Sequence, residues 1–221
     1  MTRTNRRTPL SRQAVLEAAV SVADESGIAA VSMRRIAEKL GVEAMSLYHH
    51  VRNKEAVLDA LVDLVFAEIE LPSADIGWRM AMRDRAVSAR QVLARHAWAI
   101  SMMDSRARPG PATLRHHDTV LGILRNDGFS LVAAAHAISV LDSYVYGFVM
   151  QEHALPFDAA TGAGVQDVAG GIFEQLQTDE FPHFTEMIIH HALQPGYSYA
   201  DEFEVGLDLI LDGLDRLRRQ T

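Results

Sequence analysis

The chain contains no cysteine among its 221 residues, so disulfide bonds, thiol chemistry and cysteine-based zinc sites are excluded. It also lacks a glycine-rich phosphate loop and the nucleophile elbow of hydrolases. No secretory signal is present at the polar, basic N-terminus. The longest apolar run, residues 131–150, is interrupted by His136 and Asp142, which argues against a transmembrane span. These absences predict a soluble, cytoplasmic protein with no membrane partner.

Strand-like alternation of polar and apolar residues is missing as well, whereas apolar residues recur at helical spacing along most of the chain. With 48% hydrophobic residues the chain can bury a substantial core, enough for one or two domains. We therefore predict an all-α fold. The composition changes at the segment LPSADIG, residues 71–77, which predicts a boundary between a first domain, residues 1–70, and a second, residues 71–221. Helices are expected over residues 78–96, 97–103, 111–126, 131–153, 165–177, 182–193 and 200–219.

Residues 32–51, SMRRIAEKLGVEAMSLYHHV, contain two short amphipathic segments separated by Gly41. Ser32 is placed to cap the first helix, and Gly41 tolerates the left-handed backbone that ends it. The second helix is expected from Glu43 to about Val51, with its polar and aromatic side chains outward. This is a helix-turn-helix pattern, and a helix of this kind fits the major groove of B-DNA.

The flanking residues agree with a small helical head. Ser11 and Asn53 are expected to cap a helix on each side of the motif, and both helices carry an apolar stripe. Residues 1–54 contain nine basic and five acidic residues, whereas the remainder contains twelve basic and twenty-four acidic residues. A basic end on an acidic body orients a protein on DNA, although charge alone is equally typical of a solvated face and a disordered tail.

The run from Leu10 to about Glu68, above all LGVEAMSLYHHVRNKEAVLDAL, resembles the DNA-binding domain of the TetR family of transcriptional repressors. More weakly, the remainder is similar to the effector domain of the tetracycline-repressor subgroup. The landmarks are Trp78, Arg108-Pro109, NDGFS at 126–130 and VGLDLILDGL at 205–214. The resemblance implies a repressor that is not an enzyme, that binds a palindromic double-stranded operator as a homodimer, and that is released by a small molecule.

The family motif, carried over position by position, implies which residues contact DNA. Arg34 matches a position at which arginine binds guanine, and Ser46, Tyr48 and Lys54 match phosphate-contacting positions. His49 falls on an aromatic contact position. Ala44 stands where the tetracycline repressors have a base-reading amide, and Met45 replaces a proline or small residue, so the operator should differ from theirs. The expected DNA-contacting residues are Ser32, Arg34, Ala44, Met45, Ser46, Tyr48, His49 and Lys54.

Two late helices, residues 131–150 and 200–219, carry more apolar surface than one small domain needs. A helix that is apolar nearly all round is expected to be buried on every side. In the family these helices pair with their copies in a four-helix dimer interface, which is what the resemblance implies here. The alternative is that both helices fill the core of a monomer.

The resemblance places an effector cavity among the helices of the second domain. The residues expected to line it are Trp98, Met102, Met103, His117, Leu121, Ile138, Asp142 and Tyr146. The tetracycline receptors hold drug-bound magnesium with a histidine, but Met103 stands at that position and Arg85 replaces a drug-binding amide. Because a thioether is a poor partner for magnesium, we expect an apolar or amphipathic effector and no metal or other cofactor. The same composition is also typical of a plain bundle interior.

An enzymatic alternative rests on the adjacent residues His116, His117 and Asp118. A His-Asp pair helps to bind metals in helical phosphohydrolases, alongside further histidines and an aspartate. The companions would have to come from His96, His136 or His190, together with Asp142. The spacing is unspecific, and solvent-exposed helix histidines are the simpler interpretation, so no catalytic or metal-ligating residue is predicted.

Overall fold

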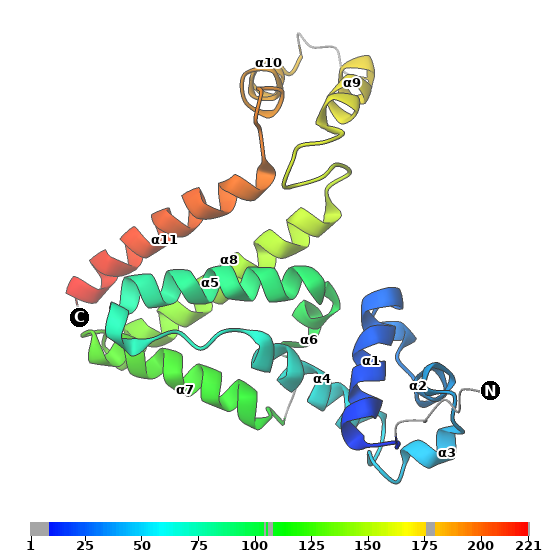
Figure 1. The fold of residues 1–221 in the computed structure, drawn as a ribbon. Helices are drawn as coiled ribbons and strands as arrows, with labels where there is room; N and C mark the ends of the chain where they lie inside the picture. Colours follow the sequence, from blue (N-terminus) through cyan, green and yellow to red (C-terminus); the bar gives the residue numbers. More distant parts are fainter. Residues whose placement is uncertain (1–8, 104, 106–107, 176–179, 221) are drawn as a thin grey trace, which may run out of the picture. The chain divides into compact units, whose positions relative to one another are not determined.

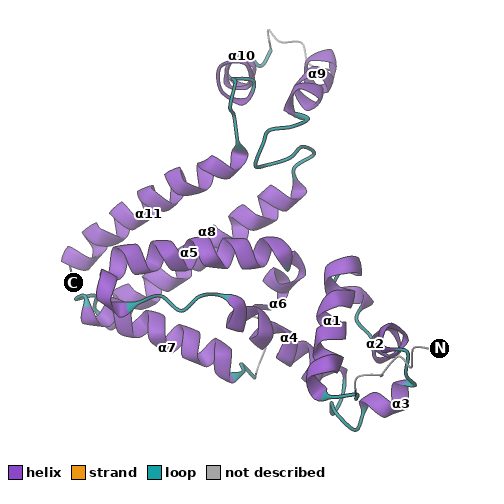
Figure 2. Ribbon diagram, viewed as in Figure 1, coloured by secondary structure: helices purple, strands orange, loops and turns teal. Residues whose placement is uncertain are grey.

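The computed structural model describes residues 9–103, 105, 108–175 and 180–220. Within these ranges it consists of helices and loops, without a strand (Figures 1 and 2), which confirms the predicted all-α fold. The helices are α1 (Arg12–Ser26), α2 (Met33–Leu40), α3 (Ala44–Leu47), α4 (Lys54–Glu68), α5 (Trp78–Arg95), α6 (Ile100–Met103), α7 (Pro111–Asn126), α8 (Leu131–Ala154), α9 (Val165–Gln175), α10 (Pro182–Met187) and α11 (Glu202–Arg219). The basic N-terminal arm expected around Arg3, Arg6 and Arg7 lies outside the described residues.

The chain divides by its internal contacts into two compact units, residues 1–123 and 124–221. The first unit holds α1 to α6 and most of α7, and the second holds α8 to α11. The boundary expected after residue 70 falls between α4 and α5, which contact each other inside the first unit. The division into residues 1–70 and 71–221 therefore stays a prediction about function, distinct from this division by packing.

A small apolar core joins the first four helices. Leu16 of α1, Ile36 of α2, Leu47 of α3 and Leu61 of α4 are each at most 2% exposed and belong to one buried cluster. Burial of a side chain of this size stabilises the fold by roughly 1.5–3 kcal/mol. This core fixes the helix-turn-helix as a rigid head.

The predicted N-caps are confirmed at Ser11, Ser32 and Asn53, and Ser130 caps α8 in the same way. In each case the side-chain oxygen accepts a hydrogen bond from the amide three residues later, at 2.8–3.2 Å. Each cap satisfies an amide that the helix itself leaves without a partner, which contributes about 1 kcal/mol. The helix starts are thus encoded locally.

The second unit is built around the contact between α8 and α11. Leu141 and Val145 of α8 and Leu207 and Leu211 of α11 are fully buried. Tyr144 stacks on Phe203 with ring centroids 5.4 Å apart, and its hydroxyl donates to the carbonyl of Phe203 at 2.9 Å. The two helices are therefore fastened by both apolar packing and a polar contact.

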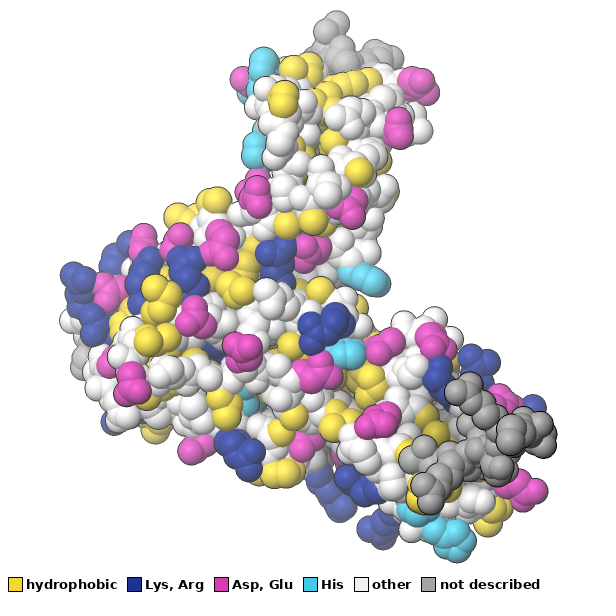
Figure 3. Space-filling view, viewed as in Figure 1, with side chains coloured by type: hydrophobic (Ala, Val, Ile, Leu, Met, Phe, Trp, Pro, Cys, Tyr) yellow, Lys and Arg dark blue, Asp and Glu magenta, His cyan; other side chains and the backbone are white. Residues whose placement is uncertain are grey.

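The outer faces of α8 and α11 carry large apolar side chains that are uncovered in the single chain. The exposed side chains are Leu131 (64%), Val132 (64%), Val140 (46%) and Met150 (60%) on α8, and Val205 (59%) and Leu209 (68%) on α11. Figure 3 shows hydrophobic side chains lying among the charged ones along α11. The expectation that α8 is buried on every side is therefore wrong for a single protomer. The inner face of α8 is buried by the rest of the chain, whereas its outer face is exposed to solvent.

Among the described residues α8 alone is long and apolar enough to cross a membrane, and 39% of its apolar window is buried inside the protein. Its inward face packs on α11, and Tyr144 is hydrogen-bonded to the backbone of that helix. These are the contacts of a core helix.

Candidate nucleic-acid interface

The turn between α2 and α3 has the geometry that the sequence predicts. Gly41 has φ 66° and ψ 35°, the left-handed conformation that a side chain would strain. The amide of Val42 donates to the carbonyl of Ala37 at 3.0 Å, which closes the end of α2. The chain therefore reverses within two residues and presents α3 beside α2.

The second motif helix is shorter than expected. The α-helix covers only Ala44–Leu47, not Glu43 to about Val51, and it continues as a turn in which the amides of His50 and Val51 both donate to the carbonyl of Leu47. Leu47 is fully buried and Val51 is 6% exposed. The chain tightens here because Val51 must enter the head core before Asn53 starts α4 with an extended backbone.

The outer face of α3 and its turn is accessible. Met45 is 73% exposed, Tyr48 is 47% exposed and His49 is exposed, whereas Ala44 and Ser46 are half-buried. Figure 3 shows histidine side chains gathered over α3, with lysine and arginine side chains close by. A surface that mixes hydroxyl, imidazole and thioether groups can contact both phosphates and base edges.

Two of the expected DNA contacts have partners in the free protein. Arg34, whose side chain is 87% exposed, pairs with Glu38 one turn later at 2.8 Å. An exposed pair of this kind contributes only about 0.3–0.5 kcal/mol, so the guanidinium of Arg34 can exchange Glu38 for another acceptor at little cost. The hydroxyl oxygen of Ser32 accepts from the amide of Arg35, and a hydroxyl that accepts in this way can still donate its own hydrogen; that Ser32 contacts DNA stays a prediction. Lys54 is exposed at the first position of α4.

A second ion pair holds α2 to α1. Lys39 donates to Glu25 at 2.6 Å. The hydrogen bond from Lys39, followed by that from Ser21, lowers the pKa of the Glu25 carboxyl. Lys39 is thus a structural residue of the head.

Polar contacts connect the head with the helices that follow it. Asp24 of α1 accepts from the indole N–H of Trp98 at 2.6 Å and lies 2.7 Å from Nδ1 of His96. Glu68, at the end of α4, accepts from Arg95 at 2.8 Å and approaches Nε2 of His96 at 3.3 Å. His96 is therefore held between a carboxylate of α1 and a carboxylate of α4.

α4 is also fastened to the start of α7. Asp63 accepts from the amide and the hydroxyl of Thr113 at 2.9 and 3.0 Å. A Cβ on Gly110 would overlap the carboxyl group of Asp63, so this approach requires glycine. The carboxylate thus accepts from the amide of Thr113, one of the first amides of α7, which the helix itself leaves without a partner.

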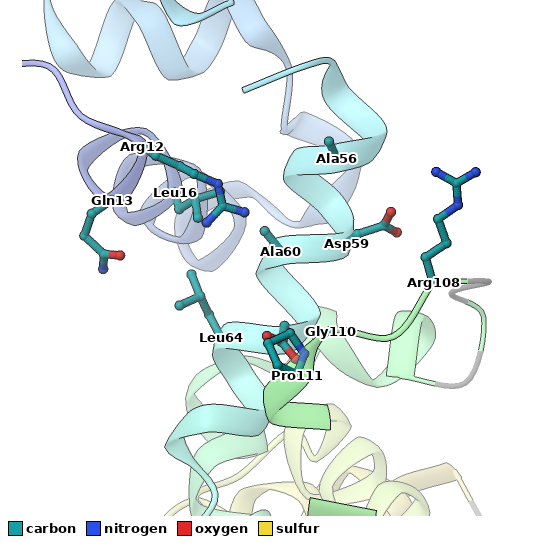
Figure 4. Close-up of a pocket in the computed structure, with 11 residues that line it drawn as sticks. Arg12, Gln13, Leu16, Ala56, Asp59, Ala60, Leu64, Arg108, Gly110 and Pro111 are labelled. Atoms are coloured by element: carbon teal, nitrogen blue, oxygen red, sulfur yellow. The ribbon is translucent and has the colours of Figure 1, made fainter. Parts of the chain in front are cut away.

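A surface cleft of about 400 Å³ lies beside this contact, lined by residues of α1, α4 and the start of α7 (Figure 4). Its charged side chains are Arg12, Asp59, Asp63 and Arg108. Both signs of charge are present, and Asp63 is already engaged by Thr113, so the cleft has no clear preference for an ion of either sign.

The residues expected to line the effector cavity divide between the two units. In the first unit Met102 and Met103 are buried, and His117 and Leu121 are half-buried on α7. In the second unit Ile138, Asp142 and Tyr146 are half-buried on α8. Their shared role in one cavity stays a prediction.

Trp98 has a different set of contacts from those expected of an effector-lining residue. Its indole N–H is engaged by Asp24, and its ring packs against the buried core of the head. The ring of His96 lies edge-on to it at 6.0 Å. Trp98 therefore belongs, in this structure, to the polar contact between α1 and the helices after α5.

The expectation that His116 is a solvent-exposed helix histidine is wrong, because its side chain is only 1% exposed. Helical periodicity could have indicated this, since His116 lies four residues before the buried Val120 on α7. The described residues contain no group of three or more His, Asp or Glu side chains that could hold a metal ion. The phosphohydrolase alternative has no support in this part of the chain.

Comparison with known proteins agrees with this architecture. Residues 15–61 match the family model for bacterial regulatory proteins of the tetR family, and residues 71–218 match the model for the tetracyclin repressor-like C-terminal domain. The chain therefore belongs to the TetR family of transcriptional regulators, which are DNA-binding proteins.

Among its relatives, the HTH-type transcriptional repressor DrrR1 of Streptomyces coeruleorubidus is 32% identical over 96% of this chain and 79% of its own length. The tetracycline repressor protein class D of Escherichia coli is 31% identical over 94% of this chain and 96% of its own length. The crystal structure of ActR from Streptomyces coelicolor in complex with actinorhodin has a TM-score of 0.72 at 27% identity, covering 94% of this chain and 97% of ActR.

Proposed function

We propose that the chain is a repressor that binds an inverted-repeat operator as a homodimer in the cytoplasm and releases it when a small apolar or amphipathic molecule binds. The observation that carries this proposal is the exposed face of α3, with Met45, Tyr48 and His49 presented on a rigid head. Arg34 and Lys54 add cationic groups on either side of that face in sequence.

The uncovered apolar faces of α8 and α11 support the homodimer. Leu209 of α11 and Met150 of α8 are each at least 60% exposed, so both helices present apolar side chains that the single chain leaves uncovered. A second copy offers the same two faces, and a twofold axis then brings two heads to two half-sites. One head alone supplies half of the DNA contacts.

Release by a small molecule is supported by the relatives and by the polar contacts of the head. DrrR1 and the class D protein are named repressors, and ActR has been crystallised with actinorhodin. In this chain His96 lies between Asp24 of α1 and Glu68 of α4, so a shift of the helices after α4 is transmitted to the head. A ligand that prefers the shifted arrangement weakens operator binding by that preference.

Selection of binding sites from random DNA by the purified protein tests this function. The expected result is enrichment of an inverted repeat, with a mobility shift that requires both half-sites. The matched control is the double variant Tyr48→Ala and His49→Ala, which leaves Leu47 and the head core intact and should enrich nothing. Recovery of no preferred sequence by the unmutated protein would contradict the proposal.

A further inference from the structure

Two polar side chains form a buried pair within the first unit. Arg85 of α5 is 2% exposed and His116 of α7 is 1% exposed. Nε of Arg85 donates to Nε2 of His116 at 2.9 Å. A guanidinium and an imidazole are rarely buried together without a specific reason, since both lose hydration.

The pair fixes the hydrogen positions on the imidazole. A guanidinium can only donate, so Nε2 of His116 must be the accepting nitrogen. The ring is neutral, because burial, followed by the charges of Arg85 and His117, lowers its pKa to about 3. The one ring hydrogen is therefore on Nδ1.

Nδ1 of His116 has no hydrogen-bond partner among the described protein atoms, although it is fully buried. The ring of Phe66 lies 5.5 Å away and that of His117 6.2 Å away, so its neighbours include aromatic rings. Buried donors are nearly always paired in proteins. An N–H that is held in a fixed direction is a prepared donor for an oxygen acceptor, and its hydrogen bond is strongest to an ionised oxygen.

We propose that His116 donates from Nδ1 to an acidic oxygen of the effector, a carboxylate or a phenolate, and that Arg85 is the positioning residue that orients the ring. This inference rests on the proposed function and adds to it the chemical class of the ligand: an amphipathic acid with an apolar ring system. An imidazole N–H donates more strongly to an anionic oxygen than to a neutral one, and it cannot accept from the N–H groups of an amine. The effector is thus distinguished by charge as well as by apolar surface.

Calorimetric titration with naphthoate and with its neutral amide, naphthamide, tests the proposal without knowledge of the natural effector. The two probes have the same ring system and differ in charge. The unmutated protein should bind naphthoate about ten- to a hundredfold more tightly than naphthamide. His116→Leu should abolish this preference, His116→Asn should keep part of it because its amide can donate from the same region, and the exposed His183→Gln should leave it unchanged.

Nitrogen NMR of the histidine rings gives a readout that a purely structural role does not predict. His116 should show the Nδ1–H tautomer in the free protein, its Nδ1 signal should shift on addition of naphthoate, and Arg85→Met should mix the two tautomers. Three results would overturn the proposal. They are equal affinity for the two probes, no binding of naphthoate at millimolar concentration, and an equal loss of affinity for both probes in a folded His116→Leu variant.

Operator binding is measured on the same samples. Operator binding without a preference for naphthoate would support the proposed function and contradict the proposed effector site. A preference for naphthoate without operator binding would support the effector site and contradict the proposed function.

Discussion

The indole N–H of Trp98 donates a hydrogen bond to the carboxylate of Asp24, 2.6 Å away. The same carboxylate oxygen lies 2.7 Å from Nδ1 of His96, so one acidic side chain of α1 holds two side chains that follow α5. Asp24 is therefore a direct polar link between the DNA-binding head and the helices on which an effector would act.

Asp24→Asn should weaken this link while keeping its size. Loss of the charge should lower the stability by about 1 kcal/mol, since the carboxylate is one-third exposed. The larger effect should be on coupling: the effector should change the operator dissociation constant less than in the unmutated protein. Thermal melting and operator titrations with and without effector measure the two effects. Glu17→Gln, on the exposed face of the same helix, is the control, and unchanged coupling in Asp24→Asn would show that the link is only structural.

Arg34→Ala should cost about 1–3 kcal/mol in operator binding and relax the preference for one base, because a side chain that forks onto guanine is lost. Lys54→Ala should instead weaken all sequences alike and reduce the salt dependence of binding. Binding-site selection with each variant separates the two outcomes. An unaltered base preference in Arg34→Ala would remove this residue from the interface.

Leu209→Glu should produce monomers that lose operator affinity. Leu209 is 68% exposed in the protomer, so a charge there disturbs only a surface that a second copy would cover. Leu211 and Val145 are unsuitable for this test, because both are fully buried within the protomer and a charge would unfold it. Sedimentation at micromolar concentration distinguishes monomer from dimer, with the exposed substitution Asp167→Asn as control. A monomeric unmutated protein would contradict the proposed dimer.

Much of the head could be predicted from the sequence because its signals are local. Ser32, Gly41 and Asn53 each act on amides or backbone angles within a few residues, and the structure places all three as expected. The end of α3 was predicted less well. Its tightening depends on burial of Val51 in a core that residues distant in sequence complete, and periodicity carries no such information.

The site residues outside the head show the same limit. His116 and Arg85 are thirty-one positions apart, and their pairing arises from the packing of α7 against the rest of the first unit. Trp98 was expected to line an effector cavity because the resemblance to the tetracycline repressors places it on a helix that lines that cavity. Its contact with Asp24, seventy-four positions earlier, could not be derived from local pattern.

His116 should make stability depend on pH. Its pKa is about 3 in the folded protein and 6.5 in the unfolded chain, so the unfolded state binds the extra proton between these values. Stability should therefore fall as pH is lowered from 6.5 towards 3, with a contribution from this group of up to about 1.4 kcal/mol per pH unit. Above pH 6.5 the group should contribute no slope. Denaturant unfolding across this range should show a shallower slope for His116→Leu than for the unmutated protein, and identical slopes would place the ring in a less buried state.

Tetracycline with magnesium should not release the protein from its operator. The tetracycline-repressor resemblance places Met103 where a histidine would hold the metal, and its thioether, 6% exposed, is too soft a ligand for magnesium. Arg85 stands where an amide would bind the drug, and it is engaged with His116. Operator-bound fractions are measured with tetracycline in the presence of magnesium and again after chelation of the metal. Both operator-bound fractions should equal the fraction measured without drug, whereas an amphipathic acid that binds this site should lower the operator-bound fraction. Release by tetracycline only when magnesium is present would contradict this prediction and indicate that metal coordination is the basis of effector binding.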